Sequence, residues 1–135
     1  MVVSGIARER KQQLEDELQA FVNRWNRDPS VKKIILFGSV AGGDVHRDSD
    51  LDLIIVQETD KKFLSRLEPF YRDAPIATDI LVYTPDEFAA MAEGIFLKNA
   101  LQDGVVVYEA GAGTRRKQMG ELPRAFWAGL LGYHR

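Results

Sequence analysis

The chain has 135 residues, 45% of them hydrophobic and 28% charged, which is the composition of a single folded domain and excludes a disordered chain. Its net charge of -2 argues against stable binding to duplex nucleic acid, and the absence of cysteine excludes disulfides, thiolate zinc sites and a cysteine nucleophile. No apolar run approaches the roughly 20 residues of a membrane span, and the first residues lack the pattern of a signal peptide. We therefore expect a cytoplasmic protein without a membrane segment.

The first half of the chain predicts one helix followed by two strands. Apolar residues recur on one helical face over residues 14–25, and the helix should end before Pro29, because the residue preceding a proline avoids helical backbone angles. Residues 31–37 contain a compact apolar run that predicts a strand, and the pair Gly38-Ser39 ends it. A short polar turn then leads to a second apolar strand at residues 51–56.

A helix and a third strand are predicted next. Thr59 is placed to cap a helix that has an apolar face. The members of this face are Phe63, Leu64, Leu67, Phe70 and Tyr71. After that helix, residues 76–83 predict a strand.

The last predicted elements are a capped helix and a short strand. Thr84 suits the N-cap position, Pro85 suits the first helical position, and Glu87 closes a capping box. This helix should continue, with a break at Gly94, until Gly104 ends it, and a strand follows at residues 105–108. The order of elements predicts an α+β domain, similar to α/β folds, with a small mixed β-sheet flanked by helices.

Charge is unevenly distributed along the chain. Residues 1–110 carry 13 basic and 19 acidic side chains, whereas residues 111–135 carry five basic and one acidic side chain. We therefore expect a domain at residues 1–110 and a basic C-terminal tail at residues 111–135, composed of a linker and a short helix. The tail could dock on a partner, pack on the sheet of its own domain, or be a frayed end.

Three acidic residues stand at strand positions where apolar residues would be expected. Asp50 and Asp52 are two residues apart, so their side chains would share one face of a strand, although a turn or the alternative pair Asp48 and Asp50 also fits the pattern. Asp79 has a similar place near the start of the next strand, where an acid without a function is the alternative interpretation. Neighbouring carboxylates repel unless a cation lies between them, and oxygen ligands favour hard ions. The three acids therefore predict a site for two metal ions, Mg²⁺ or Mn²⁺.

The pair Gly38-Ser39 predicts a place where an anion could bind. A strand that ends in Gly-Ser before a helical start exposes backbone N–H groups, glycine lets a phosphate approach the backbone, and the serine hydroxyl can donate a hydrogen bond to it. A tight turn that binds nothing is the alternative interpretation.

Together these residues resemble the signature of the polymerase-beta-type nucleotidyltransferase superfamily, which is Gly-Ser, a short spacer, and Asp-x-Asp before an apolar strand. Here the signature stands as Gly38-Ser39 and Asp50-Leu51-Asp52, and the third acid of the family maps to Asp79. The similarity is to the small stand-alone minimal nucleotidyltransferases, and it covers roughly residues 31–109. It implies a polymerase-beta-like nucleotidyltransferase fold.

The resemblance also implies an activity and a partner. A nucleoside monophosphate, with AMP expected, would move from a nucleoside triphosphate to an acceptor hydroxyl, and pyrophosphate would leave. Asp50, Asp52 and Asp79 would be catalytic and would hold two Mg²⁺ ions, or Mn²⁺, while Gly38 and Ser39 would bind the phosphates of ATP. Minimal members often act as the antitoxin of a separate HEPN-type toxin and AMPylate a tyrosine of it, so a HEPN-type partner protein is expected. Exposed strand edges and the first amphipathic helix are compatible with a homodimer.

One departure from the family pattern keeps two alternatives open. Gly42 stands where many minimal members carry Arg, and Arg47 is the basic residue of the same loop that could replace it. The first alternative is a catalytically weakened scaffold that acts on its partner by contact. The second is a sensor that binds a triphosphate without transferring it. A Ser-His hydrolase is not supported, because neither His46 nor His134 has a serine partner in a recognisable motif.

Overall fold

The computed structural model describes residues 2–41, 50–74, 78–91, 94, 95, 98 and 104–111. The predicted tail, apart from Gly111, lies outside the described residues. So do most of residues 92–103 and the loop 42–49, which contains Gly42 and Arg47. None of the described helices combines the length and the hydropathy that crossing a membrane requires.

A four-stranded mixed sheet forms the centre of the domain, with the strand order β3-β2-β1-β4. Strand β1 (Val31–Phe37) lies antiparallel to both β2 (Leu51–Gln57) and β4 (Val105–Glu109). Strand β2 lies parallel to β3 (Thr78–Tyr83). The predicted α+β class with a small mixed sheet is confirmed, and each described strand lies close to its predicted range.

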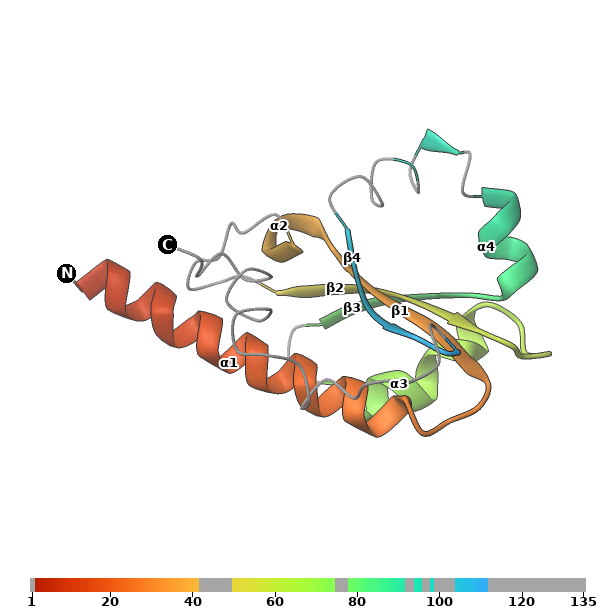
Figure 1. Cartoon of the computed structure of the whole chain (residues 1–135), viewed down its shortest axis with the longest axis horizontal. Helices are drawn as coiled ribbons and strands as arrows, with labels where there is room; N and C mark the ends of the chain where they lie inside the picture. Colours follow the sequence, from red (N-terminus) through yellow and green to blue (C-terminus); the bar gives the residue numbers. More distant parts are fainter. Residues whose placement is uncertain are drawn as a thin grey trace.

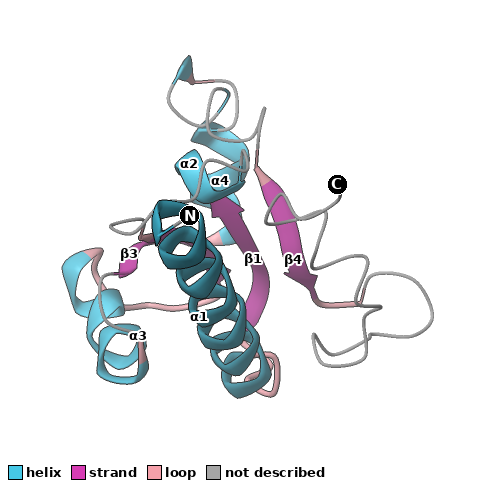
Figure 2. Ribbon diagram, turned by 90° about the vertical axis from the view of Figure 1, so that its left-hand side faces the viewer, coloured by secondary structure: helices cyan, strands magenta, loops and turns pink. Residues whose placement is uncertain are grey.

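The helices cover both faces of this sheet, as Figures 1 and 2 show. Helix α1 (Val2–Trp25) runs along one face together with α3 (Leu67–Asp73), and α4 (Pro85–Met91) lies on the other face. The short helix α2 (Gly38–Ala41) follows directly on β1. Helix α1 extends a further twelve residues toward the N-terminus beyond the predicted apolar stripe, which begins at Leu14.

The main hydrophobic core lies between the sheet and the helices α1 and α3. Helix α1 contributes the predicted stripe, which is buried throughout. Its members are Leu14, Leu18, Phe21, Val22 and Trp25. In β2 and β3, alternate residues face this core and the residues between them face α4, where Ile35, Ile54 and Tyr83 form a smaller cluster with Phe88. The same alternation sets the face of the residues at the starts of β2 and β3.

The prediction for the segment after β2 was wrong in its details. The Thr59 hydroxyl accepts a hydrogen bond from the backbone N–H of Lys61 (3.1 Å) in a turn, and neither the 3₁₀ helix η1 (Leu64–Arg66) nor α3 has a side-chain N-cap. Of the five residues of the predicted apolar face, Phe70 is fully buried and Leu67 is partly buried. The other three are exposed by 39% (Phe63), 76% (Leu64) and 44% (Tyr71). A 3₁₀ turn has three residues per turn instead of 3.6, so the helical period assumed for Phe63 and Leu64 does not hold before α3.

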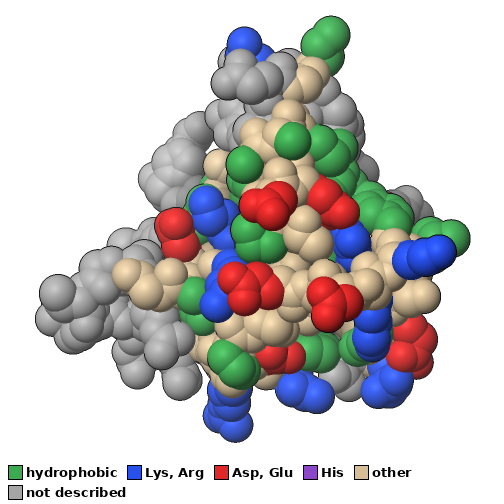
Figure 3. Space-filling model, turned by 90° about the vertical axis from the view of Figure 1, so that its right-hand side faces the viewer, with side chains coloured by type: hydrophobic (Ala, Val, Ile, Leu, Met, Phe, Trp, Pro, Cys, Tyr) green, Lys and Arg blue, Asp and Glu red, His purple; other side chains and the backbone are tan. Residues whose placement is uncertain are grey.

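Charges of both signs are interspersed on the surface shown in Figure 3, which is the right-hand side of Figure 1 and lies at the end of the sheet away from the starts of β2 and β3. Lys33 Nζ lies 3.6 Å from a carboxylate oxygen of Glu109, and Lys32 Nζ lies 4.0 Å from one of Glu58. Exposed ion pairs of this kind contribute little to stability. The described residues of this face therefore do not form a continuous basic track for a nucleic-acid backbone.

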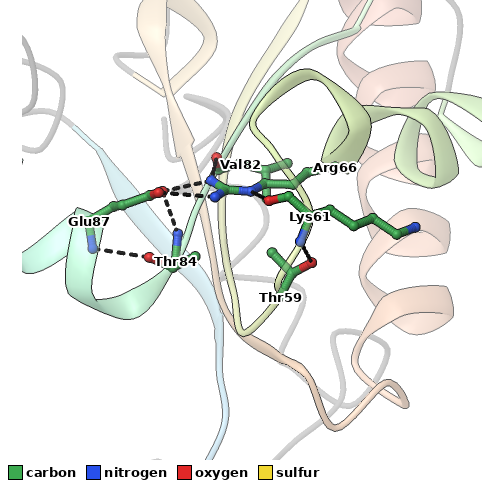
Figure 4. A network of polar contacts seen from close by, with 6 residues as sticks. All are labelled: Thr59, Lys61, Arg66, Val82, Thr84 and Glu87. Carbon is green, nitrogen blue, oxygen red and sulfur yellow. Dashed lines mark hydrogen bonds and ion pairs between the residues drawn. The ribbon is translucent and has the colours of Figure 1, made fainter.

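The capping box at the start of α4 is confirmed and is part of a larger polar network (Figure 4). The Thr84 hydroxyl accepts a hydrogen bond from the Glu87 backbone N–H (3.1 Å), and Glu87 Oε1 accepts one from the Thr84 N–H (3.0 Å). The guanidinium of Arg66, a buried residue that the sequence analysis did not single out, donates to both Glu87 oxygens at 2.6 and 3.0 Å. It also donates to the backbone carbonyls of Lys61 and Val82. The network thus ties the turn before α3 to the end of β3 and to α4.

The carboxylate of Glu87 should make the stability of the domain depend on acidity. The hydrogen bonds from Arg66 and from the Thr84 N–H lower the pKa of Glu87 from 4.5 to about 2. A lowered pKa in the folded state stabilises the fold above pH 4.5, and this contribution is lost as the pH falls toward 2. Because the Glu87 side chain is 42% exposed, solvent screening reduces the effect. We expect Glu87→Gln to lower the free energy of unfolding by about 1 kcal/mol at pH 7.

Urea denaturation of the parent and of Glu87→Gln at pH 7, 4 and 2.5 measures this difference, which should shrink at each step toward acid. Glu68→Gln is the matched control, because Glu68 also pairs with an arginine, Arg72, but both side chains are about two thirds exposed. The control should leave stability unchanged at pH 7. A difference for Glu87→Gln that stays constant across this pH range would contradict the assignment.

Candidate functional site

Asp52 and Asp79 lie side by side at the end of the sheet where β2 and β3 begin. The parallel register pairs Asp52 of β2 directly with Asp79 of β3. Because side chains alternate along a strand, Asp52 shares the face of Ile54, and Asp79 shares the face of Leu81. Both carboxylates therefore belong to the α4 side of the sheet, beside the smaller apolar cluster.

The environment of Asp52 disfavours its charged form. Burial raises the pKa of Asp52 most, followed by the negative charges of Asp79 and Asp50 and a hydrogen bond with Asp79, and together they raise the pKa from 3.8 to about 6. A carboxylate placed among other carboxylates in a partly buried position is costly to ionise unless a cation balances the charge. Such perturbed groups are enriched at functional sites, which makes this pair the candidate site of the protein.

Asp50 lies just before β2 and contacts helix α1. Strand β2 begins at Leu51, so Asp50 precedes the strand, and its side chain is 47% exposed. Asp50 Oδ1 lies 3.8 Å from Arg10 Nη2 of helix α1. The structure thus brings Asp52 and Asp79 into direct contact and places Asp50 close enough for its charge to act on Asp52.

Gly38 lies directly against the Asp52 carboxylate. Its φ angle is +83°, in the left-handed region that glycine adopts easily. A Cβ atom at position 38 would lie 2.2 Å from Asp52 Oδ2, so the carboxylate would have to move. The sequence explains this glycine by a bound phosphate, and the structure adds a second reason, which is the close approach of the Asp52 carboxylate to the turn from β1 into α2. Ser39 belongs to α2, and its side chain lies outside the described atoms.

Arg10 is the residue of this site that sequence reasoning missed. It lies four residues before Leu14 and therefore continues the buried stripe of α1. A charged residue in line with an apolar stripe is the sequence signal that could have identified it. Its side chain is only 16% exposed. A mostly buried arginine on the core side of a helix that points toward an acidic group is a candidate for a role in binding.

The carboxylate oxygens of this site are suitable ligands for a hard divalent cation. All the donors are carboxylate oxygens, which Mg²⁺ and Mn²⁺ prefer, and the raised pKa of Asp52 shows that a positive charge beside it would be favourable. In the described part of the chain, no three His, Asp or Glu side chains are arranged to hold one ion together. Asp52 and Asp79 are the two that stand together, and Asp50 is turned to Arg10.

Comparison with known proteins identifies the class of this domain. The family model described as "Nucleotidyltransferase domain" matches residues 18–109, about two thirds of the chain. The chain therefore belongs to the nucleotidyltransferase domain family. The matched segment contains Gly38, Asp50, Asp52 and Asp79 and begins after Arg10.

Two individual proteins are similar to this chain. A protein of Methanocaldococcus jannaschii named "Putative protein adenylyltransferase" is 33% identical over 79 residues, which cover 58% of this chain and 79% of that protein. A Sulfolobus solfataricus crystal structure, described as that of a "putative nucleotidyltransferase", superimposes with a TM-score of 0.60. It covers 78% of this chain and 88% of its own at 20% identity, so this second likeness supports the fold.

Proposed function

We propose that the protein transfers a nucleoside monophosphate, AMP in particular, from a nucleoside triphosphate to an acceptor hydroxyl in a metal-dependent reaction. The observation that carries the proposal is the contact of Asp52 with Asp79 above Gly38, inside the segment that matches the nucleotidyltransferase family. A carboxylate such as that of Asp52, whose charge is made costly by burial and by the neighbouring Asp79 and Asp50, is suited to a site that receives a cation with its substrate.

In the proposed reaction the acceptor oxygen forms a bond to the α-phosphorus, and the bond from that phosphorus to the β-phosphate oxygen breaks. Divalent ions, when bound, would stabilise the attacking and the leaving oxygens. Asp50, Asp52 and Asp79 would hold these ions, with Asp79 also placed to accept the proton of the acceptor hydroxyl. Gly38 and Ser39 would contact the β- and γ-phosphates, and Gly38 also leaves room for the carboxylate of Asp52.

The acceptor in this proposal is a protein side chain. The name of the Methanocaldococcus jannaschii relative supports this choice, because it is called an adenylyltransferase of proteins. A HEPN-type toxin as that partner, with an antitoxin role in the cytoplasm, follows from the sequence resemblance and stays a prediction, as do the homodimer and the separate tail at residues 111–135.

Calorimetric titration with ATP, GTP, CTP and UTP, with and without Mg²⁺, tests the proposal. We expect binding that requires Mg²⁺, prefers ATP, and disappears in the Asp50→Asn/Asp52→Asn double variant. Asp86→Asn is the matched control, because Asp86 is an exposed acid of α4, and it should bind like the parent. Transfer is then measured with radiolabelled ATP and an acceptor protein, beginning with a HEPN-type protein. A folded parent that binds no triphosphate would contradict the enzyme and favour a scaffold, whereas binding without transfer would favour a sensor.

A further inference from the structure

Arg10 links helix α1 to the acid site and is outside the segment that the family model matches. Its Nη2 lies 3.8 Å from Asp50 Oδ1, and its Nη1 donates a hydrogen bond of 2.8 Å to Gln13 Oε1 on the next turn of α1. Leu14 and Leu18, on the turns that follow, are fully buried in the core. The packed helix therefore keeps Arg10 beside the rim of the acid site.

The contact between Arg10 and Asp50 is weak enough to be exchanged. At 3.8 Å this ion pair is longer than a direct charge-assisted hydrogen bond, and about half of the Asp50 side chain faces solvent. Ion pairs that are screened by solvent on one partner, as here on Asp50, are worth about 1 kcal/mol or less, far less than the attraction of a carboxylate for a divalent ion. A cation that approaches the acid site would therefore compete successfully with Arg10 for Asp50.

The guanidinium released from Asp50 has an obvious new ligand in a nucleotidyltransferase. Its planar set of N–H donors matches the oxygens of a phosphate, and a triphosphate carries more negative charge than the single carboxylate it replaces. Arg10 lies on the rim of the site, where Asp50 is exposed, and not among the paired acids Asp52 and Asp79.

We propose that Arg10 is a nucleotide-binding residue that exchanges partners. It holds the Asp50 carboxylate in the metal-free protein and contacts the triphosphate when a divalent ion takes Asp50. This inference rests on the proposed function and adds to it a phosphate-binding residue on α1. It differs from a structural role, in which Arg10 would orient Asp50 as a metal ligand throughout the cycle.

The two roles predict opposite effects on metal binding without nucleotide. Binding of Mn²⁺ alone is followed by electron paramagnetic resonance of the free ion, in the parent and in Arg10→Gln. If Arg10 competes with the ion, Arg10→Gln binds Mn²⁺ about twofold to fivefold more tightly, as loss of an exposed ion pair implies. If Arg10 orients Asp50, the variant binds Mn²⁺ more weakly.

Nucleotide binding is then measured by calorimetry with Mg²⁺ and a non-hydrolysable ATP analogue. Arg10→Gln should weaken this binding about tenfold, as expected for the loss of a charge-assisted hydrogen bond to a phosphate. Arg10→Lys keeps the charge but not the planar set of donors, so its affinity for the ATP analogue should lie between those of the parent and of Arg10→Gln. Arg24→Gln removes a positive charge near the other end of α1 and should change neither measurement. Circular dichroism verifies that each variant is folded.

The outcomes separate this inference from the function on which it rests. If the parent binds Mn²⁺ no better than Asp52→Asn, the proposed function is overturned, and the role of Arg10 with it. If the parent binds Mn²⁺ and nucleotide through Asp52, but Arg10→Gln shows weaker or unchanged Mn²⁺ binding or unchanged nucleotide binding, only the exchange by Arg10 is overturned. If Arg10→Gln does not fold, the test uses Arg10→Lys, and an unchanged nucleotide affinity of that variant overturns the exchange by Arg10. Tighter Mn²⁺ binding together with weaker nucleotide binding supports it.

Discussion

Replacing Asp52 by Asn is expected to abolish nucleotidyl transfer while the protein stays folded and, without metal, becomes more stable at neutral pH. The amide has the same size but no charge, so one ligand of the proposed cations is lost. Metal stabilisation of the reacting oxygens is worth several kcal/mol, which corresponds to a rate loss on the order of a thousandfold or more.

The gain in stability follows from the direction of the pKa shift. The pKa of Asp52 is raised from 3.8 to about 6, first by burial and then by Asp79 and Asp50. The folded state thus prefers the protonated form, so this group favours folding most below pH 3.8 and loses that contribution as the pH rises through 6. At pH 7 the charged Asp52 costs about 1–2 kcal/mol, a range already reduced for solvent screening, and Asp52→Asn should recover it.

Two measurements test this prediction. Transfer of labelled AMP gives the loss of activity, and urea denaturation with a chelator at pH 7 and pH 5 gives the change in stability. The advantage of Asp52→Asn over the parent should be larger at pH 7 than at pH 5, and the exposed Asp86→Asn should match the parent in both. Normal turnover by folded Asp52→Asn would falsify the catalytic role of this residue.

Gly38→Ala is expected to impair stability and activity together. The φ angle of +83° strains any residue with a side chain by about 1–2 kcal/mol. The added Cβ would also lie 2.2 Å from Asp52 Oδ2, so the carboxylate must move away from its place beside Asp79. We expect a loss of about 2–3 kcal/mol in the free energy of unfolding. Activity should fall at least about a hundredfold, because misplacement of a ligand by about 1 Å has an effect of this size.

Gly111→Ala separates the two causes. Gly111 also has a positive φ angle, of 73°, but nothing lies within 4 Å of the Cβ that it would gain. This control variant should show the backbone strain, about 1 kcal/mol, and keep full activity. Thermal unfolding and the transfer assay are compared for the two variants. If Gly38→Ala loses no more activity than Gly111→Ala, the position of Asp52 does not depend on Gly38 in the way the contact suggests.

The sequence determined those features that depend on neighbours along the chain. The apolar stripe of α1 and the strand at residues 31–37 were predicted because burial imposes a period of 3.6 on a helix and favours a compact apolar run in a strand. The capping box of Thr84 and Glu87 was predicted because its hydrogen bonds connect residues three positions apart. Gly38 and the acids were recognised because their spacing is short and specific.

Only the tertiary structure decided how distant segments meet. The parallel pairing of β2 with β3 places Asp52 beside Asp79, and the course of α1 places Arg10 beside Asp50. The bond between Arg66 and Glu87 likewise joins segments with no shared sequence pattern. The segment after β2 contains a 3₁₀ turn, which has three residues per turn instead of 3.6. The apolar face predicted there from an α-helical period was therefore wrong. Periodicity specifies which face of an element is buried, but packing against the rest of the sheet selects which charged groups become partners.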